Sequence, residues 1–205
     1  MAQVSEGRLE AATESFREAC RLDESDHDAC YYLSRALYAS GRYTDAVEPF
    51  AKALRAVRKE DRWRVFRGMG RNHEALAEAP EAERCFREAM RLSRGKAGPD
   101  EDPGIDYGMF LFRAGRTEEA LKPLGDAVRA HPASSRARAE LGRVLMQADR
   151  LEDAARQLEK AIELDPKAWN ARLLLGRAYV RLGRIEEGER ELRLGAQGQG
   201  SSAAR

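Results

Sequence analysis

Residues 151–183 contain two successive blocks in which apolar residues recur with the period of an α-helix. In the first block, Ala154, Leu158 and Ala161 fall at i, i+4 and i+7, which places them on one helical face. The block ends at Pro166, because proline interrupts a helix. The second block carries small and large apolar residues at the same spacing: Ala171, Leu174, Leu175, Ala178, Tyr179 and Leu182. This pattern predicts a helical hairpin with an apolar seam on both arms, which a single hairpin cannot bury.

The same pattern returns in register along the chain. Equivalent positions of successive repeats form columns of similar residues. The column at the turn between the two helices is mostly glycine: Gly7, Gly41, Ala77, Gly115, Asp149 and Gly183. Five residues after the turn comes a column of small residues: Ala12, Ala46, Ala82, Ala120, Ala154 and Gly188. Four residues further is a column of large apolar residues: Phe16, Phe50, Phe86, Leu124, Leu158 and Leu192. Three residues further is a second column of small residues: Ala19, Ala53, Ala89, Ala127, Ala161 and Gly195. A Gly/Ser column precedes the turn: Ser34, Gly70, Gly108, Gly142 and Gly176. Successive members of the first small column are 34, 36, 38, 34 and 34 residues apart, and this period predicts a solenoid.

With these columns the sequence resembles the tetratricopeptide repeat family from about Ala2 to Gly195. The resemblance implies an all-α, right-handed superhelical solenoid of stacked antiparallel helix-turn-helix repeats, about five of them after an N-terminal partial one. Departures from the family pattern are local, such as Ala77 and Asp149 in place of the turn glycine. Because the family is a scaffold with many roles, the pattern indicates fold more strongly than function.

The solenoid is expected to span residues 1–195. Its expected divisions are a partial repeat and five full ones: 1–26, 27–60, 63–94, 101–134, 135–168 and 169–195. Only six residues precede Gly7, so we expect the first helix to be cut short and the true start to lie upstream of Met1; the alternative is a frayed cap. Residues 95–104, rich in Pro, Gly and acids, predict a solvated loop and a looser joint, and residues 196–205 are expected to be disordered.

Composition and charge mainly argue against particular classes of function. The net charge of +1 gives no argument for binding nucleic acid or a membrane surface. The chain carries no phosphate-binding glycine loop and no nucleophile motif, and its three histidines are isolated. We therefore expect no catalytic residue, no metal site, no cofactor and no enzymatic activity.

Cysteine usage and hydropathy bear on the compartment. Cys20, Cys30 and Cys85 form no C-x-x-C pair, and we expect free thiols in a reducing compartment. No apolar run reaches membrane length and no signal-like segment opens the chain. These features predict no membrane insertion and a cytoplasmic location; the alternative is a targeting segment upstream of Met1.

The resemblance places certain positions of each first helix on a concave inner surface. These positions combine arginine with aromatic and apolar side chains, and form the predicted peptide-binding groove: Tyr31, Arg35, Tyr38, Arg67, Arg71, Met109, Phe112, Arg113, Arg143, Met146, Arg177 and Arg181. Guanidinium groups suit carboxylates, and methionine and aromatic rings offer adaptable apolar contact. The alternative is that arginine is simply a common solvated residue in this chain.

These observations favour a non-enzymatic protein-interaction scaffold that binds a peptide or partner segment, of acidic character, in the groove. A second hypothesis is a regulatory or targeting module cut from a larger enzyme or envelope-assembly protein. Nucleic-acid binding is disfavoured by the near-zero net charge and the lack of a repeated base-reading code. The sequence shows no polar cap helix after the last repeat, so we expect partial exposure of three apolar residues, which favours self-association or contact with a following domain: Ile185, Leu192 and Leu194.

Overall fold

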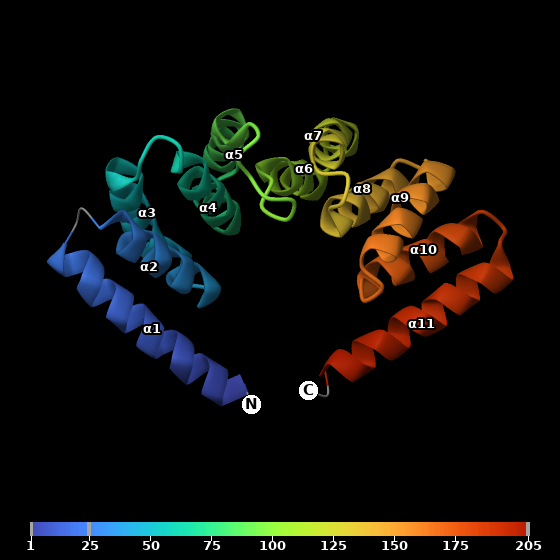
Figure 1. Ribbon diagram of the computed structural model, residues 1–205, viewed down its shortest axis with the longest axis horizontal. Helices are drawn as coiled ribbons and strands as arrows, with labels where there is room; N and C mark the ends of the chain where they lie inside the picture. The colour runs from blue at the N-terminus through green and yellow to red at the C-terminus, as the bar shows by residue number, and fades with distance from the viewer. Residues whose placement is uncertain (1, 24–25, 204–205) are drawn as a thin grey trace. The chain divides into compact units, whose positions relative to one another are not determined.

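The computed structural model describes residues 2–23 and 26–203, and within these residues the chain forms eleven α-helices and no strand (Figure 1). The contacts divide the chain into two compact units that meet between Lys96 and Ala97, inside the loop of residues 95–104. Both units are stacks of helical hairpins, so the fold class predicted from the sequence, an all-α repeat solenoid, is confirmed.

The first unit contains a single helix followed by two hairpins. Its helices are α1 (Ala2–Leu22), α2 (His27–Ala39), α3 (Tyr43–Ala56), α4 (Arg62–Ala75) and α5 (Ala79–Ser93). Helix α2 pairs with α3 and α4 with α5, while α1 packs on α2 and α3 on α4. Each hairpin therefore buries its seam partly within itself and partly against the next element in the stack.

The second unit contains three hairpins. Its helices are α6 (Pro103–Arg113), α7 (Thr117–Ala130), α8 (Ser135–Gln147), α9 (Leu151–Leu164), α10 (Trp169–Arg181) and α11 (Ile185–Ala203). Helix α6 pairs with α7, α8 with α9 and α10 with α11, and α7 packs on α8 as α9 packs on α10. Asp102 begins α6 as its N-cap, because its side chain accepts a hydrogen bond of 2.7 Å from the Gly104 amide.

Every hairpin turn described here passes through a residue in the left-handed region, as the turn column predicted. The φ angles are positive at all five positions: Gly41 (72°), Ala77 (60°), Gly115 (77°), Asp149 (59°) and Gly183 (80°). This conformation redirects the chain and lets the amide three residues beyond the end of the helix reach back to a late carbonyl, as Arg150 does to Leu145 at 2.9 Å. Ala77 and Asp149 adopt it at a cost of about 1–2 kcal/mol each, which the packing of the hairpin offsets.

The columns meet across the helix pairs and form the core. Phe50, Phe86, Leu124 and Leu158 are at most 2% exposed, and so are the small residues that flank them. The Gly/Ser column lies against these large side chains: a β-carbon at Gly142 would lie 2.6 Å from Leu158 Cγ, closer than such atoms approach. Glycine is therefore required by the helix spacing rather than by backbone conformation.

At the N-terminal end, the structure differs from the prediction in two respects. Helix α1 is continuous through Gly7, so the predicted turn at that glycine is wrong. A turn is favourable only where the returning helix has a face to pack against, and otherwise helix propagation continues.

The prediction of free thiols is also wrong for two cysteines: Cys20 of α1 and Cys30 of α2 form a disulfide, because the packed helices bring their Cα atoms to 4.9 Å. The cysteine argument for a reducing compartment therefore no longer applies.

At the C-terminal end, α11 extends to Ala203, whereas the sequence predicted a disordered tail over residues 196–205; residues 204–205 lie outside the described part. Gly195 and Gly198 allow this extension, because they bring the helix backbone against Leu173 and Trp169 of α10. A search of the described helices finds none that combines the length and the apolar character needed to span a bilayer.

Candidate functional site

The first helices of the hairpins contact one another in sequence within each unit. In the second unit α6 contacts α8 and α8 contacts α10, and in the first unit α2 contacts α4. The predicted groove residues lie on these helices. The second unit carries seven of them: Met109, Phe112, Arg113, Arg143, Met146, Arg177 and Arg181.

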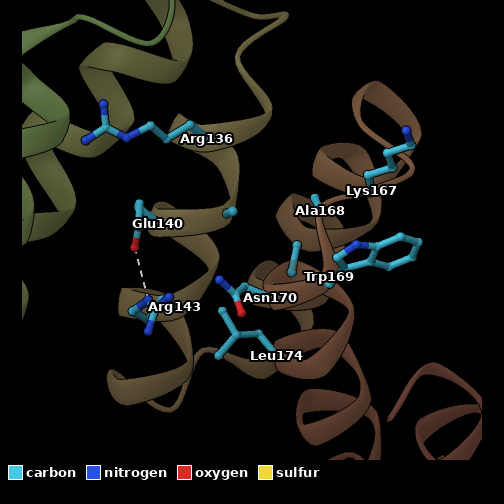
Figure 2. Close-up of a pocket in the computed structure, with 10 residues that line it drawn as sticks. Arg136, Glu140, Arg143, Lys167, Ala168, Trp169, Asn170 and Leu174 are labelled. Atoms are coloured by element: carbon cyan, nitrogen blue, oxygen red, sulfur yellow. Dashed lines mark hydrogen bonds and ion pairs between the residues drawn. The ribbon is translucent and has the colours of Figure 1, made fainter. Parts of the chain in front are cut away.

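A hollow of about 540 Å³ lies between α8 and α10, and we call it the α8–α10 hollow. The side chains that shape it are Ala139, Glu140, Arg143, Asn170, Ala171 and Leu174. Figure 2 shows Asn170 and Leu174 pointing from α10 toward α8, with Glu140 and Arg143 on the opposite wall. Helices α8 and α10 thus bring polar and apolar side chains together around the same hollow.

Small side chains explain why this place is hollow. Ala139 on α8, Ala171 on α10 and Ala168 just before α10 all line it, and each ends at the β-carbon. Larger residues at these positions would fill the space between the helices. Trp169 also lines the hollow, but its ring points away from α8 (Figure 2). A β-carbon at Gly198 of α11 would lie 2.1 Å from this ring, so the ring packs closely against the α11 backbone.

The hollow has a cationic lining. Arg136, Arg143 and Lys167 contribute positive charge and Glu140 the opposing carboxylate. Arg143 Nε lies 3.0 Å from Glu140 Oε2, with 39% of the arginine side chain exposed. An exposed ion pair of this kind contributes about 0–1 kcal/mol, so Arg143 can exchange Glu140 for another carboxylate at little cost.

Arg136 has a different role from Arg143. Its guanidinium lies 2.8 Å from Asp106 of α6, whose side chain is only 6% exposed, and Figure 2 shows it pointing away from α10. Removing the arginine would take the positively charged partner away from a buried carboxylate, which is costly. Arg136 therefore joins α8 to α6 and supports the face rather than offering an open contact.

The remaining predicted residues of the second unit divide by exposure. Arg177 is exposed on α10 and has no ion pair with the described residues. Arg181, by contrast, donates to Met146 O at 3.0 Å and to Asp149 at 2.6 Å, which fastens α10 to the end of α8. Met146 itself is only 8% exposed. On α6, Arg113 is exposed, and the other two predicted residues are partly buried: Met109 and Phe112.

In the first unit, the predicted residues of α2 contact aromatic rings. The Arg35 guanidinium lies over the rings of Tyr31 and Tyr32, at 5.7 and 5.8 Å, in cation–π geometry. The ring of Tyr38 lies 5.3 Å from that of Tyr43. Arg67 and Arg71 of α4 are partly buried. Arg35 is therefore already engaged by rings of its own helix.

The lining residues of the α8–α10 hollow that sequence reasoning missed include Lys167, Trp169, Asn170 and Leu174. Three of them precede or begin α10, where the repeat columns carry no signal. The second residue of α8 is Arg136 and the second residue of α10 is Asn170, and both line the hollow. This position could therefore have been used to predict lining residues from the sequence. Arg177, which was predicted for the groove, is not among the residues that line the hollow.

Comparison with protein families agrees with the repeat pattern. Tetratricopeptide repeat profiles match residues 1–61, 111–159 and 145–205, which together span well over half of the chain. No curated protein matches the sequence.

Solved structures show the same fold at low identity. YrrB, described as a tetratricopeptide protein with an unusual peptide-binding site, is 22% identical with a TM-score of 0.63, covering 91% of this chain and 93% of its own. PilF of Pseudomonas aeruginosa is 22% identical with a TM-score of 0.74, covering 84% and 76%. BtubC of P. vanneervenii is 13% identical with a TM-score of 0.75, covering 97% and 91%. The chain belongs to the tetratricopeptide repeat family.

Proposed function

We propose that the chain is a non-enzymatic protein-interaction scaffold whose second unit binds an acidic, partly apolar peptide segment across α8 and α10. The observation that carries the proposal is the α8–α10 hollow, a concave site with arginine on one wall and Leu174 and Asn170 on the other. Concave sites that combine apolar surface with a few convergent polar groups are the usual places for ligands.

The charges near the hollow favour a carboxylate-bearing ligand. Arg143 is held only by an exposed pair with Glu140, and Arg177 on the adjacent helix has no ion pair with the described residues. A guanidinium can take a carboxylate by two parallel hydrogen bonds, which lysine cannot do. An acidic residue of the ligand at Arg143 and a second at Arg177 would follow the direction from α8 to α10.

Apolar and amide groups supply the rest of the recognition. Leu174 offers an aliphatic contact, and the Asn170 amide can both donate to and accept from a peptide backbone. A modest interface of this kind gives micromolar affinity, about −8 kcal/mol. Because charge attraction contributes, affinity is expected to fall as salt rises.

The test uses two labelled octapeptides, one of alternating glutamate and leucine and one of alternating lysine and leucine, in fluorescence anisotropy titrations. We expect the glutamate peptide to bind saturably and more weakly at higher salt. The double variant Arg143→Glu, Arg177→Glu should lower its affinity roughly tenfold or more, since two close charge pairs become repulsive.

The matched control reverses two outward arginines of the same unit, Arg156→Glu and Arg190→Glu, which changes the net charge equally. It should leave affinity within about twofold, because these arginines lie on α9 and α11 and do not line the hollow. Equal loss in both double variants would mean that only bulk charge matters. Equal binding of the two octapeptides would contradict an acidic ligand.

A further inference from the structure

The first helices of the second unit meet through an equivalent pair of positions. One position lies two residues before the glycine of the Gly/Ser column, and the other lies six residues before that glycine in the following first helix. Between α6 and α8 these positions hold Asp106 and Arg136, whereas between α8 and α10 they hold Glu140 and Asn170. The carboxylate is therefore repeated, but the arginine is replaced by an uncharged amide.

Arg136 completes the contact between α6 and α8. Its Nη2 atom lies 2.8 Å from Asp106 Oδ1, and its Nη1 atom donates to the carbonyl oxygen of Asp100. With this guanidinium in place, the Asp106 side chain is only 6% exposed. A guanidinium carries several N–H donors in one plane, so a single arginine serves two acceptors at once. This contact shows which group satisfies a carboxylate at this position of the repeat.

The equivalent place between α8 and α10 belongs to the α8–α10 hollow. Glu140 and Asn170 both line the hollow, and Figure 2 shows Asn170 pointing toward α8. Asparagine is shorter than arginine and carries no charge, so it leaves open the space that an arginine side chain would take. The Glu140 side chain is 24% exposed, against 6% for Asp106.

The charge of Glu140 is paired only weakly. Its ion-pair partner among the described residues is Arg143 of the same helix, with Nε at 3.0 Å and 39% of the arginine side chain exposed. Exposed pairs of this kind contribute little to stability. Lys167 also lines the hollow, but it forms no ion pair within residues 2–23 and 26–203. A ligand can therefore separate the pair and offer a cation to Glu140 and a carboxylate to Arg143.

We propose that the peptide site takes an arginine of the ligand, whose guanidinium enters the α8–α10 hollow and pairs with Glu140 as Arg136 pairs with Asp106. The inference rests on the proposed function and narrows its ligand to an acidic, partly apolar segment with one internal arginine. A glutamate next to that arginine takes Arg143. A ligand with carboxylates alone would instead bring negative charge against Glu140, which disfavours binding.

Arginine suits this place better than lysine. Its planar guanidinium can donate two parallel hydrogen bonds to Glu140 and retain a further N–H for the side-chain oxygen of Asn170. Its aliphatic stem can pack on the β-carbons of Ala139 and Ala171, which line the hollow. The lysine ammonium is compact and more strongly hydrated, and it cannot form the two parallel bonds.

The test compares two labelled octapeptides of equal charge in fluorescence anisotropy titrations of the intact chain. Both are the alternating glutamate–leucine octapeptide with its fourth residue, a leucine, replaced: by arginine in one and by lysine in the other. We expect the arginine peptide to bind roughly tenfold more tightly, because only the guanidinium pairs with Glu140 through two bonds. Bulk charge attraction is the same for both peptides and cancels in the ratio of their affinities.

Protein variants locate the arginine site. Glu140→Gln removes the carboxylate and should reduce the preference for the arginine peptide to within about twofold. Asn170→Arg copies the residue that α8 carries at this position, so its own guanidinium should occupy the hollow and also remove the preference. The matched control, Glu152→Gln, neutralises an exposed carboxylate of α9 that does not line the hollow, and it should leave the preference unchanged. Circular dichroism of each variant shows whether helix content is retained.

Two outcomes would overturn the inference and leave the proposed function standing, provided that the glutamate–leucine octapeptide binds. One is equal affinity of the arginine and lysine peptides for the unaltered chain. The other is a preference for arginine that persists in Glu140→Gln, which would place the guanidinium elsewhere. Absence of saturable binding by all three peptides would refute the proposed function and the inference together.

Discussion

Alanine substitutions at Gly125 and Gly142, compared with each other, test why the Gly/Ser column exists. Both lie inside helices of the second unit, Gly125 in α7 and Gly142 in α8. A β-carbon at Gly125 would have only the end of Arg129 nearby, at 3.6 Å. At Gly142 it would lie 2.6 Å from Leu158 Cγ and 3.3 Å from the carbonyl oxygen of Ala154.

The two alanine substitutions are therefore expected to act in opposite directions. In both, alanine favours the helix by about 1 kcal/mol relative to glycine. In Gly142→Ala the new methyl meets the branch point of a buried leucine and a helix backbone, and overpacking of this kind costs about 1–3 kcal/mol. We expect Gly125→Ala to raise Tm by about 2–4 °C, and Gly142→Ala, with a net cost of about 0–2 kcal/mol, to lower it by up to about 8 °C.

The assay is thermal unfolding followed by circular dichroism, repeated by urea titration. A double-mutant cycle identifies the contact: in the background of Leu158→Ala, which alone costs about 2–5 kcal/mol, Gly142→Ala should lose most of its penalty. If both glycine variants raised Tm equally, close helix approach would not be the reason for the column.

Two further predictions concern other parts of the chain. Replacing Cys20 and Cys30 by serine removes a short closed loop, worth about 3 kcal/mol in the chain-entropy view, and should speed hydrogen exchange in α1; unchanged exchange would contradict this. Burial, then the hydrogen bond to Glu159, raises the pKa of Tyr179 from 10 to about 12. Its contribution to stability is complete below pH 10 and should be lost toward pH 12 in alkaline unfolding; Tyr179→Phe should lack that loss.

The sequence predicted the hairpins well because their determinants are local and repeated. A positive φ at Ala77 and Asp149 could be inferred from the glycines that occupy the same column elsewhere. Burial of Phe50 or Leu158 likewise follows from a column that is apolar in each repeat. One wrong turn, at Gly7, shows the limit: a turn residue alone does not redirect a helix unless a packing partner exists for the returning arm.

The candidate site was predicted less completely. Arg143 was expected in the groove and does line the α8–α10 hollow. Arg181 was expected there too, but it bonds to Met146 O and Asp149, residues more than thirty positions earlier in the chain. Which arginine of a repeated column is open depends on side chains of the neighbouring repeat, and these do not follow the period.

By itself, the sequence determined the repeat length, the helix order, the turn positions of the five hairpins and the places where glycine or alanine must lie between helices. These follow from helical periodicity and from the steric limits on helix approach. Only the tertiary structure decided that Cys20 meets Cys30 and that Ala139, Ala168 and Ala171 leave a hollow. Each of these depends on distances between residues of different helices, and the repeat pattern of the sequence does not contain these distances.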